Sequence, residues 1–338
     1  MEVSLFLSRK VSSGTLPPQA RLVPLDVSAF SRRPERGNLR ALVALIAAYR
    51  ECRHVLAFWK PQVAVAFGGY ASVPGAAAAL SMRIPLVLHE QNVIPGLANR
   101  LLEPFARRVA VSFQETLDYR PRWKKKAVLT GNPLLRRPGE GAGDAWEHFG
   151  LERERKTLAV VGGSQGAASL NRAVLEALPV WRGRTDLQVV HAVGRDKYRE
   201  FLDQAAEVDS GGLLYRPLEF IERMDLLYEA ADLLVCRAGA STVTELAAAG
   251  CAAILVPYPH ATAAHQDANA AVLQRAGAAV VIEDRELDGV RLAREVDILL
   301  ADEGRLQEMR KASRRLGRPQ AAEELADLVM QTGGGGGK

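Results

Sequence analysis

The chain has 338 residues, of which 48% are hydrophobic and 25% are charged, so it can bury a large core and is predicted to form two domains. This composition excludes a mainly disordered protein, and Gly, Pro or charged residues interrupt every long apolar stretch, so no membrane-spanning helix is expected. Residues 1–155 contain 23 Lys and Arg against 13 Asp and Glu, whereas residues 156–338 contain 21 against 26. The basic first half predicts contact with an anionic partner.

The three cysteines, Cys52, Cys236 and Cys251, are too few and too scattered for a disulfide framework or a zinc site. Because the N-terminus also lacks the pattern of a signal peptide, a cytoplasmic protein is expected. Aromatic residues make up 6% of the chain and do not interleave with the basic clusters, so no nucleic acid partner is expected. Anionic lipid or a phosphorylated ligand fits the basic half at least as well.

Residues 1–37 offer one short apolar run, Val3–Leu7, followed by polar and Pro-rich sequence. An α/β domain of the dinucleotide-binding type begins with a buried strand and a Gly-rich turn into its first helix. We therefore expect either that the first βα unit is absent or that this run is the second strand of such a domain.

Past residue 55, short β-branched runs that end in Gly or Pro alternate with Ala- and Leu-rich stretches of helical spacing, which is typical of parallel sheets built from βαβ units. The predicted strands of the first half are 62–67, 85–89, 108–112 and 127–130, and its clearest helices are 38–59 and 73–81. The predicted strands of the second half are 157–161, 187–192, 212–216, 233–236, 253–256 and 279–282. We expect an α/β chain with two parallel sheets.

Composition also predicts the segment boundaries. Residues 134–156 are rich in Gly, Pro and charge, so we expect a linker between an N-terminal domain, 1–133, and a C-terminal domain, 157–301. Residues 302–331 form a helical stretch long enough to return to the first domain. The Gly-rich residues 332–338 predict a disordered tail.

The turn VVGGSQGAA, residues 160–168, is the strongest local signal for ligand binding. An apolar strand stops on Gly162 and Gly163 and a helix follows at once, so backbone N–H groups and the positive end of the helix dipole point at one spot that suits a phosphate. The Ser164 hydroxyl can donate to the same oxyanion, and Gly166 permits a close approach. The alternative is a tight turn in which Ser164 only caps the helix. GK[ST] and the full GxGxxG pattern are both absent.

A second turn, CRAGASTVTELAAAG at residues 236–250, also follows a strand and opens a helix. Ser241 is predicted as the N-cap of that helix. Glu245 has two interpretations, which the sequence leaves open. It either closes a capping box with Ser241 or Thr242, or accepts both hydroxyls of a ribose, as acidic residues do in many nucleotide sites.

A third turn, residues 257–270, follows the next strand and is polar where open α/β sheets bind ligands. His260 and His265 have no third well-placed ligand, so a metal is not expected. Gln266 and Asn269 are predicted to hydrogen-bond a sugar.

The predicted strand at 85–89 ends in four polar residues, His89-Glu90-Gln91-Asn92. Polar side chains at the carboxyl end of an apolar strand are hard to place in a core, so we expect them to face a cleft. The alternative is that Asn92 caps a helix while His89 is satisfied internally.

Seven motifs occur together, in order and at suitable spacing: GGYASVP (68–74), IPLVLHEQNVIPGLANR (84–100), TGNP (130–133), VVGGSQGAASLN (160–171), residues 220–224, CRAGASTVTELAAAG (236–250) and HQDANA (265–270). Together they resemble the MurG family of peptidoglycan glycosyltransferases over residues 20–330. The resemblance implies a GT-B architecture, in which two Rossmann-like domains with parallel sheets face each other across a cleft.

The resemblance also implies an activity and a location. The chain would transfer N-acetylglucosamine (GlcNAc) from UDP-GlcNAc, with inversion, onto the undecaprenyl-diphosphate-linked MurNAc-pentapeptide lipid I, giving lipid II. It would need no metal or other cofactor. The basic N-terminal domain would rest on the anionic inner leaflet, so the protein would be peripheral on the cytoplasmic face of the cell membrane.

By the same resemblance, the C-terminal domain would hold UDP-GlcNAc. The matching contacts are Ser164, Gln165 and Gly166 for the diphosphate, Ile221 for the uracil and Gln266 for the GlcNAc, with Asn92 contributed by the N-terminal domain. The nucleotide would also meet Ala240, Ser241, Thr242, Val243, Thr244 and Glu245, with Glu245 on the ribose.

The sequence departs from the family in two places. The family's N-terminal GGTGGH-type loop, which supplies a cleft-facing His, has no counterpart here, so the general base is unknown and His89 and Glu90 are the nearest candidates. After TGNP, Leu135 stands where the family has Arg, and Arg136 would substitute if the loop shifts by one residue. The first departure supports an alternative, a nucleotide-sugar-binding relative that is impaired or non-catalytic. A Rossmann oxidoreductase is disfavoured because GxGxxG is absent.

Overall fold

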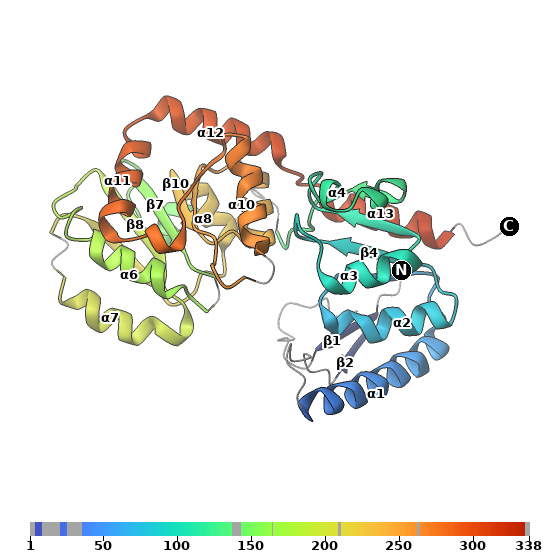
Figure 1. Cartoon of the computed structure of the whole chain (residues 1–338). Coiled ribbons are helices and arrows are strands. Elements are labelled where there is room, and N and C mark those ends of the chain that lie inside the picture. The colour runs from blue at the N-terminus through green and yellow to red at the C-terminus, as the bar shows by residue number, and fades with distance from the viewer. Residues whose placement is uncertain are drawn as a thin grey trace. The chain divides into compact units, whose positions relative to one another are not determined.

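The structure is a computed structural model that describes residues 4–8, 21–25, 36–136, 143–163, 165–208, 211–261 and 264–334. The chain folds into two compact units: unit 1 comprises Met1–Gly131 and Ala322–Lys338, and unit 2 comprises Asn132–Ala321 (Figure 1). Each unit has its own parallel strands and covering helices, which confirms the predicted α/β class.

Unit 1 contains a four-stranded parallel sheet in the order β3-β4-β5-β6. Its strands are β3 (Ala64–Ala66), β4 (Leu86–Glu90), β5 (Arg108–Val111) and β6 (Ala127–Leu129). All four overlap predicted strands. They are recognisable because parallel strands covered on both faces are short, nearly continuous apolar runs.

A separate parallel pair in unit 1 joins β1 (Ser4–Ser8) to β2 (Arg21–Leu25). β1 falls on the predicted apolar run, whereas β2 has no counterpart among the predicted strands. Pro24 in the middle of β2 argues against a strand, since proline cannot donate to a sheet. Tertiary packing overrides this local signal, because Leu25 is fully buried in a core with Cys52 and Leu56.

Helices cover both faces of the four-stranded sheet. Successive side chains of β4 alternate between the faces. Leu88 packs on one side with Trp123, while Val87 packs on the other with Leu325 and Leu328. The helices of unit 1 are α1 (Arg36–Trp59), α2 (Val73–Ser81), α3 (Leu97–Leu102), α4 (Thr116–Tyr119) and α13 (Ala321–Gly334).

The C-terminal helical stretch differs from the prediction. Residues 302–331 do not form one helix, because the chain breaks after Leu316 into α12 (Glu303–Leu316), which belongs to unit 2, and α13, which packs on the sheet of unit 1. Gly317 and Pro319 stand at the break. The expected disordered tail is wrong for residues 332–334, since α13 continues to Gly334 and Thr332 Oγ1 donates to the Leu328 carbonyl. Residues 335–338 lie outside the described residues.

Unit 2 contains a six-stranded parallel sheet in the order β12-β11-β10-β7-β8-β9. Its strands are β7 (Lys156–Val161), β8 (Leu187–Ala192), β9 (Leu214–Leu218), β10 (Leu233–Cys236), β11 (Ala253–Leu255) and β12 (Ala279–Val281). All six overlap predicted strands, although β9 begins two residues later than expected. This is the doubly wound strand order of a Rossmann sheet.

Helices surround the sheet of unit 2 and bury one large core with it (Figure 1). They are α5 (Ala145–Phe149), α6 (Ala168–Ala177), α7 (Tyr198–Ala206), α8 (Met224–Ala230), α9 (Ala240–Ala249), α10 (His265–Arg275), α11 (Gly289–Leu300) and α12. α5 lies within the expected linker, 134–156. A helix is stable there because Asp144 caps its N-terminus and because Ala145 and Phe149 are buried. Among the described residues, no helix is long and apolar enough to cross a membrane.

Candidate functional site

The carboxyl ends of β7 and β10 mark the point in unit 2 where the strand order reverses. β7 pairs with β8 on one side and β10 on the other, and Val161 lies opposite Cys236 where β7 and β10 end. In open α/β sheets, ligands bind at such a switch point. The turns that lead to α6 and α9 therefore leave the sheet side by side at the expected place for a ligand.

The turn after β7 depends on Gly166. This residue has a φ of +70°, and a Cβ on it would overlap the carbonyl oxygen of Val193, which follows β8. The Gly166 N–H donates to the Gly163 carbonyl at 3.0 Å and closes the turn. Only glycine combines this backbone conformation with so close an approach.

The N-terminus of α6 lies directly behind this turn. Its N-cap is Ala167, whose side chain cannot accept hydrogen bonds from the first N–H groups of the helix. The alternative in which Ser164 is the N-cap is therefore wrong, although Ser164 itself lies outside the described residues. Gln165 is exposed beside the turn. The end of the helix can offer its N–H groups and dipole to an anion.

The turn after β10 leads to α9 in a similar way. The N-cap of α9 is Gly239 and not Ser241, which is the second residue of the helix. Thr244 Oγ1 donates to the Ala240 carbonyl at 2.9 Å and accepts from Asn132 Nδ2 at 3.3 Å. Val243 is fully buried, so its side chain is packed in the interior of unit 2. Ser241 and Thr242 remain at the surface of the first turn.

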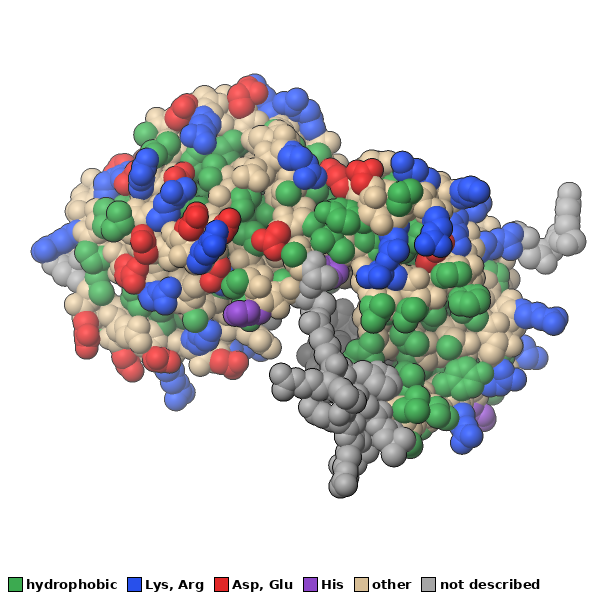
Figure 2. All heavy atoms as spheres, in the orientation of Figure 1, with side chains coloured by type: hydrophobic (Ala, Val, Ile, Leu, Met, Phe, Trp, Pro, Cys, Tyr) green, Lys and Arg blue, Asp and Glu red, His purple; other side chains and the backbone are tan. Residues whose placement is uncertain are grey.

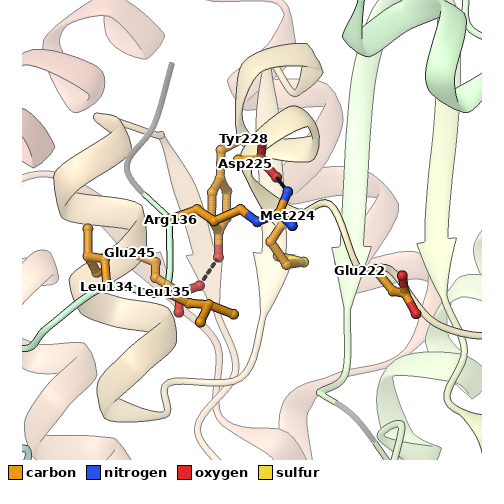
Figure 3. Close-up of a pocket in the computed structure, with 8 residues that line it drawn as sticks. All are labelled: Leu134, Leu135, Arg136, Glu222, Met224, Asp225, Tyr228 and Glu245. Carbon is orange, nitrogen blue, oxygen red and sulfur yellow. Dashed lines mark hydrogen bonds and ion pairs between the residues drawn. The ribbon is translucent and has the colours of Figure 1, made fainter. Parts of the chain in front are cut away.

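Glu245 is not part of a capping box. The N-cap of α9 is Gly239, so the residue three positions after the cap is Thr242 and not Glu245. The Oε2 of Glu245 accepts a hydrogen bond of 2.7 Å from the hydroxyl of Tyr228 on α8 (Figure 3). Burial raises the pKa of Glu245, while the hydrogen bond from Tyr228 acts in the opposite direction. The half-buried carboxylate is therefore set in place by a neighbouring helix.

Glu245 and Tyr228 line a cavity of about 100 Å³ in unit 2. The other lining residues are Leu134, Leu135, Arg136, Glu222, Met224 and Asp225. Arg136 Nη1 lies 4.0 Å from Asp225 Oδ1, and Asp225 also pairs with Arg223. The structure thus brings together two predicted site residues, Glu245 and Arg136, that are far apart in the sequence.

Tyr228 was not among the predicted site residues. It lies in α8, a short and largely buried helix, where an aromatic residue normally indicates core packing. The single local signal is its position four residues after Met224, which ends the matching stretch at 220–224. Of that stretch, Ile221 is buried, whereas Phe220 is partly exposed and carries the Arg195 guanidinium 4.6 Å above its ring.

Gln266 links the turns after β10 and β11. Its Oε1 accepts from the N–H groups of Ala238 at 3.2 Å and Tyr258 at 2.9 Å, so its amide nitrogen is the group that can donate to a sugar. Asn269 is fully buried and donates to the Ala238 carbonyl, so the prediction that it contacts a sugar is wrong. Among the described residues, no cluster of three His, Cys, Asp or Glu side chains can hold a metal ion.

His89 and Glu90 lie at the end of β4 in unit 1. The prediction that they face a cleft is wrong, because His89 is fully buried and Glu90 is 3% exposed. His89 Nε2 lies 3.0 Å from the Gly131 carbonyl, to which it must donate, and burial lowers the pKa of His89. The His89 Nδ1 atom has no partner among the described residues.

The Glu90 carboxylate organises the loop that follows β4. It accepts from the Asn92 N–H at 3.0 Å, the Gly96 N–H at 3.0 Å and Asn99 Nδ2 at 2.9 Å. Asn92 is therefore fixed through its backbone. It is not a helix cap, since α3 begins at Leu97 with Gly96 as its N-cap.

Replacement of Glu90 by Gln is expected to destabilise unit 1 by about 1–3 kcal/mol, because the amide group must turn an N–H toward donors that lose their acceptor. Thermal unfolding followed by circular dichroism measures the change. Asp118→Asn is the control, since Asp118 is exposed in the same unit. An unchanged melting temperature for E90Q would contradict the structural role of Glu90.

Comparison with known proteins decides the family. The model of the glycosyltransferase family 28 N-terminal domain matches residues 6–111, and that of the glycosyltransferase family 28 C-terminal domain matches residues 157–325. A UDP-N-acetylglucosamine–N-acetylmuramyl-(pentapeptide) pyrophosphoryl-undecaprenol N-acetylglucosamine transferase of Halothermothrix orenii is 36% identical over 316 residues, covering 92% of this chain and 85% of the relative. This chain belongs to the MurG glycosyltransferase family.

Further relatives agree with membership of the MurG family. The Moorella thermoacetica protein of the same name is 38% identical over 317 residues and covers the same shares of the two chains. Among solved structures, MurG of Acinetobacter baumannii is 28% identical and superposes with a TM-score of 0.71, over 92% of this chain and 85% of that one. The predicted resemblance is confirmed, and with it the GT-B fold.

Proposed function

We propose that this chain transfers GlcNAc from UDP-GlcNAc to the lipid-linked MurNAc-pentapeptide acceptor in peptidoglycan synthesis. The observation that carries the proposal is the switch point of unit 2, where β7 and β10 end side by side and lead into α6 and α9, the helix that carries Glu245. Membership of the MurG family supports it. The relatives named above carry this activity in their names. No comparison favours the alternative of a non-catalytic nucleotide-sugar-binding relative.

The donor diphosphate is proposed to lie against the N-terminus of α6. The loop of Ser164, Gln165 and Gly166 would contact it, supported by the glycine-dependent turn and the uncapped helix end. A diphosphate leaving group gains negative charge as the sugar is transferred. Preorganised N–H groups at this position would stabilise that charge in the transition state, and this requires no metal ion.

The nucleoside is proposed to lie over the start of α9. Ala240, Ser241, Thr242 and Thr244 are at the first turns, and Glu245 can accept both ribose hydroxyls. Because Val243 is buried, it can contribute only through its backbone.

The remaining donor contacts come from other segments. We propose that Ile221 borders the uracil and that the amide nitrogen of Gln266 donates to the GlcNAc. Arg136 is proposed to supply positive charge near Glu245, because both residues line the same cavity. Asn92 is proposed to contribute from unit 1.

Membrane association is proposed for one surface of unit 1, the α3 surface. It is defined by the exposed apolar residues Leu97, Leu101 and Phe105 and by the exposed basic residues Arg100, Arg107 and Arg108. Figure 2 shows hydrophobic side chains gathered over α3 with Lys and Arg side chains beside them. Apolar side chains that enter a bilayer, ringed by cations, match an anionic leaflet such as the cytoplasmic face of the cell membrane.

The double replacement Leu97→Ser and Leu101→Ser is expected to weaken binding to phosphatidylglycerol-containing vesicles at least about tenfold, because each fully buried Leu side chain contributes about 1.5–3 kcal/mol. Vesicle co-sedimentation measures the loss. Val290→Ser is the control, since Val290 is 72% exposed on α11 of unit 2. Equal binding of the double variant and the control would contradict the assignment.

The first test of the proposed function is transfer of labelled GlcNAc from UDP-GlcNAc to a short-chain lipid I analogue by the full chain. The expected result is one released UDP for each GlcNAc transferred, with inversion at the anomeric carbon. UDP-GlcNAc binding without turnover would favour the non-catalytic alternative. Absence of UDP-GlcNAc binding would overturn the donor site itself.

A further inference from the structure

Tyr228 is a buried residue of unit 2 that has no role in the donor site described so far. It belongs to α8 and is 9% exposed, and its hydroxyl reaches α9, where it donates to Glu245 Oε2 at 2.7 Å. Figure 3 shows the phenol pointing along the cavity toward the carboxylate. A hydrogen bond to an ionised acceptor is stronger than one between neutral groups, and a packed phenol has few rotamers to lose.

The geometry at Glu245 leaves room for a ligand. Tyr228 donates to Oε2, so Oε1 and the second lone pair of Oε2 remain for other donors. A vicinal diol such as that of a ribose presents two O–H donors, one for each of these remaining acceptor positions. The hydroxyl of Tyr228 therefore fixes the carboxylate without using all of its accepting capacity.

We propose that Tyr228 is a positioning residue for the nucleotide: its hydroxyl holds the Glu245 carboxylate in the orientation that accepts both ribose hydroxyls of the donor. The proposal rests on the donor site described under the proposed function. Tyr228 acts through Glu245 and need not touch the ligand.

The charged and titratable neighbours do not replace this hydrogen bond. Burial raises the pKa of Cys236 and of Cys251, the latter to about 12, so both thiols stay neutral near Glu245. Of the cavity's charged groups, Arg136 approaches Asp225, which also pairs with Arg223.

Glu222, the remaining charged group of the cavity lining, extends away from Glu245 in Figure 3. Within the part of the chain that the structure describes, the Glu245 carboxylate accepts its side-chain hydrogen bond from Tyr228. Loss of this bond is therefore expected to let burial raise the pKa of Glu245 further.

The test compares Tyr228→Phe with wild type by calorimetric titration of UDP and 2′-deoxy-UDP across a range of pH. Wild type is expected to bind UDP at least about tenfold more tightly than 2′-deoxy-UDP, since the deoxy ligand loses one bond to a carboxylate. Y228F is expected to lose most of this discrimination. Its UDP affinity should also begin to fall at a higher pH than that of wild type as the solution is acidified.

A matched control is Tyr215→Phe, which removes another largely buried tyrosine hydroxyl of unit 2, one bonded to His191 Nδ1 at 2.9 Å. It should keep both the discrimination and the pH profile. In a Glu245→Gln background, Y228F should add almost nothing, because the two side chains act as one unit. Tyr228→Met keeps an apolar side chain and should give the same result as Y228F. It provides a second test of the hydroxyl if Y228F folds poorly.

The role of Tyr228 would be overturned if Y228F and Tyr228→Met still discriminated between UDP and 2′-deoxy-UDP as wild type does, with an unshifted pH profile. The proposed function would then still stand. A wild-type chain that binds neither UDP nor UDP-GlcNAc would instead overturn the proposed function. The two failures are therefore distinguishable.

Discussion

Glu245→Ala is expected to weaken UDP-GlcNAc binding at least about tenfold, a loss of about 1.4 kcal/mol. The replacement removes the acceptor of the ribose hydroxyls and also leaves the buried hydroxyl of Tyr228 without its acceptor. Calorimetric titration with UDP-GlcNAc measures the affinity. A second variant, Glu245→Gln, keeps the shape of the side chain and should show most of the same loss.

The control for this prediction is Glu222→Ala. Glu222 lines the same cavity but is exposed and extends away from Glu245 (Figure 3). Its removal changes the net charge by the same amount, so any general electrostatic effect on an anionic ligand would appear in both variants. Unchanged affinity in E245A, or an equal change in E222A, would remove the ribose assignment.

The second large effect is expected from Gly166→Ala, which should reduce the transfer rate about 100-fold, the scale of losing one preorganised oxyanion donor. The added Cβ would overlap the Val193 carbonyl oxygen, and Gly166 already has a left-handed φ of +70°. The turn must therefore move away from β8, which carries the N–H groups before α6 out of line with the diphosphate. Steady-state turnover and UDP affinity, measured together, separate lost catalysis from lost binding.

Gly183→Ala is the matched control for the turn. Gly183 has a φ of +79° but no described atom within 4 Å of a Cβ, and it lies before the amino end of β8, whereas the turn of Gly166 lies at the carboxyl ends of the strands. Its replacement carries the same backbone penalty of about 1–2 kcal/mol without moving the turn. Equal losses of activity in the two variants would show that stability alone, and not the position of the turn, is responsible.

The candidate catalytic residues show where reasoning from local sequence fails. A polar run at the end of a strand suggested open side chains at His89 and Glu90, yet both are buried. The loop after β4 folds back over them, and its own Asn92 and Gly96 N–H groups donate to Glu90. The sequence shows the polar residues but not the donors that reach them from several residues further along the chain.

Arg136 illustrates the opposite case. By position in the sequence it is displaced by one residue from the family's arginine, and spacing alone could not say whether it reaches the donor site. The structure places Arg136 in the lining of the cavity that contains Glu245, next to Leu134 and Leu135, which line it as well. A loop without regular secondary structure can absorb a shift of one residue, because no helical or strand periodicity fixes which side chain points inward.

The α/β class, the ten strands of the two larger sheets and the two glycine-rich turns are predictable from the sequence, because they depend on local chemistry: apolar runs, helical periodicity and the freedom of glycine. The existence of β2, the burial of His89 and Glu90, and the partner of Glu245 are known only from the three-dimensional structure. Each of those depends on contacts that the local sequence pattern does not show. For Glu245 the fold excludes the capping box, because α9 begins after Gly239 and the carboxylate accepts from Tyr228 of a neighbouring helix. The donors around a carboxylate come from the tertiary structure, and they decide what the carboxylate can still bind.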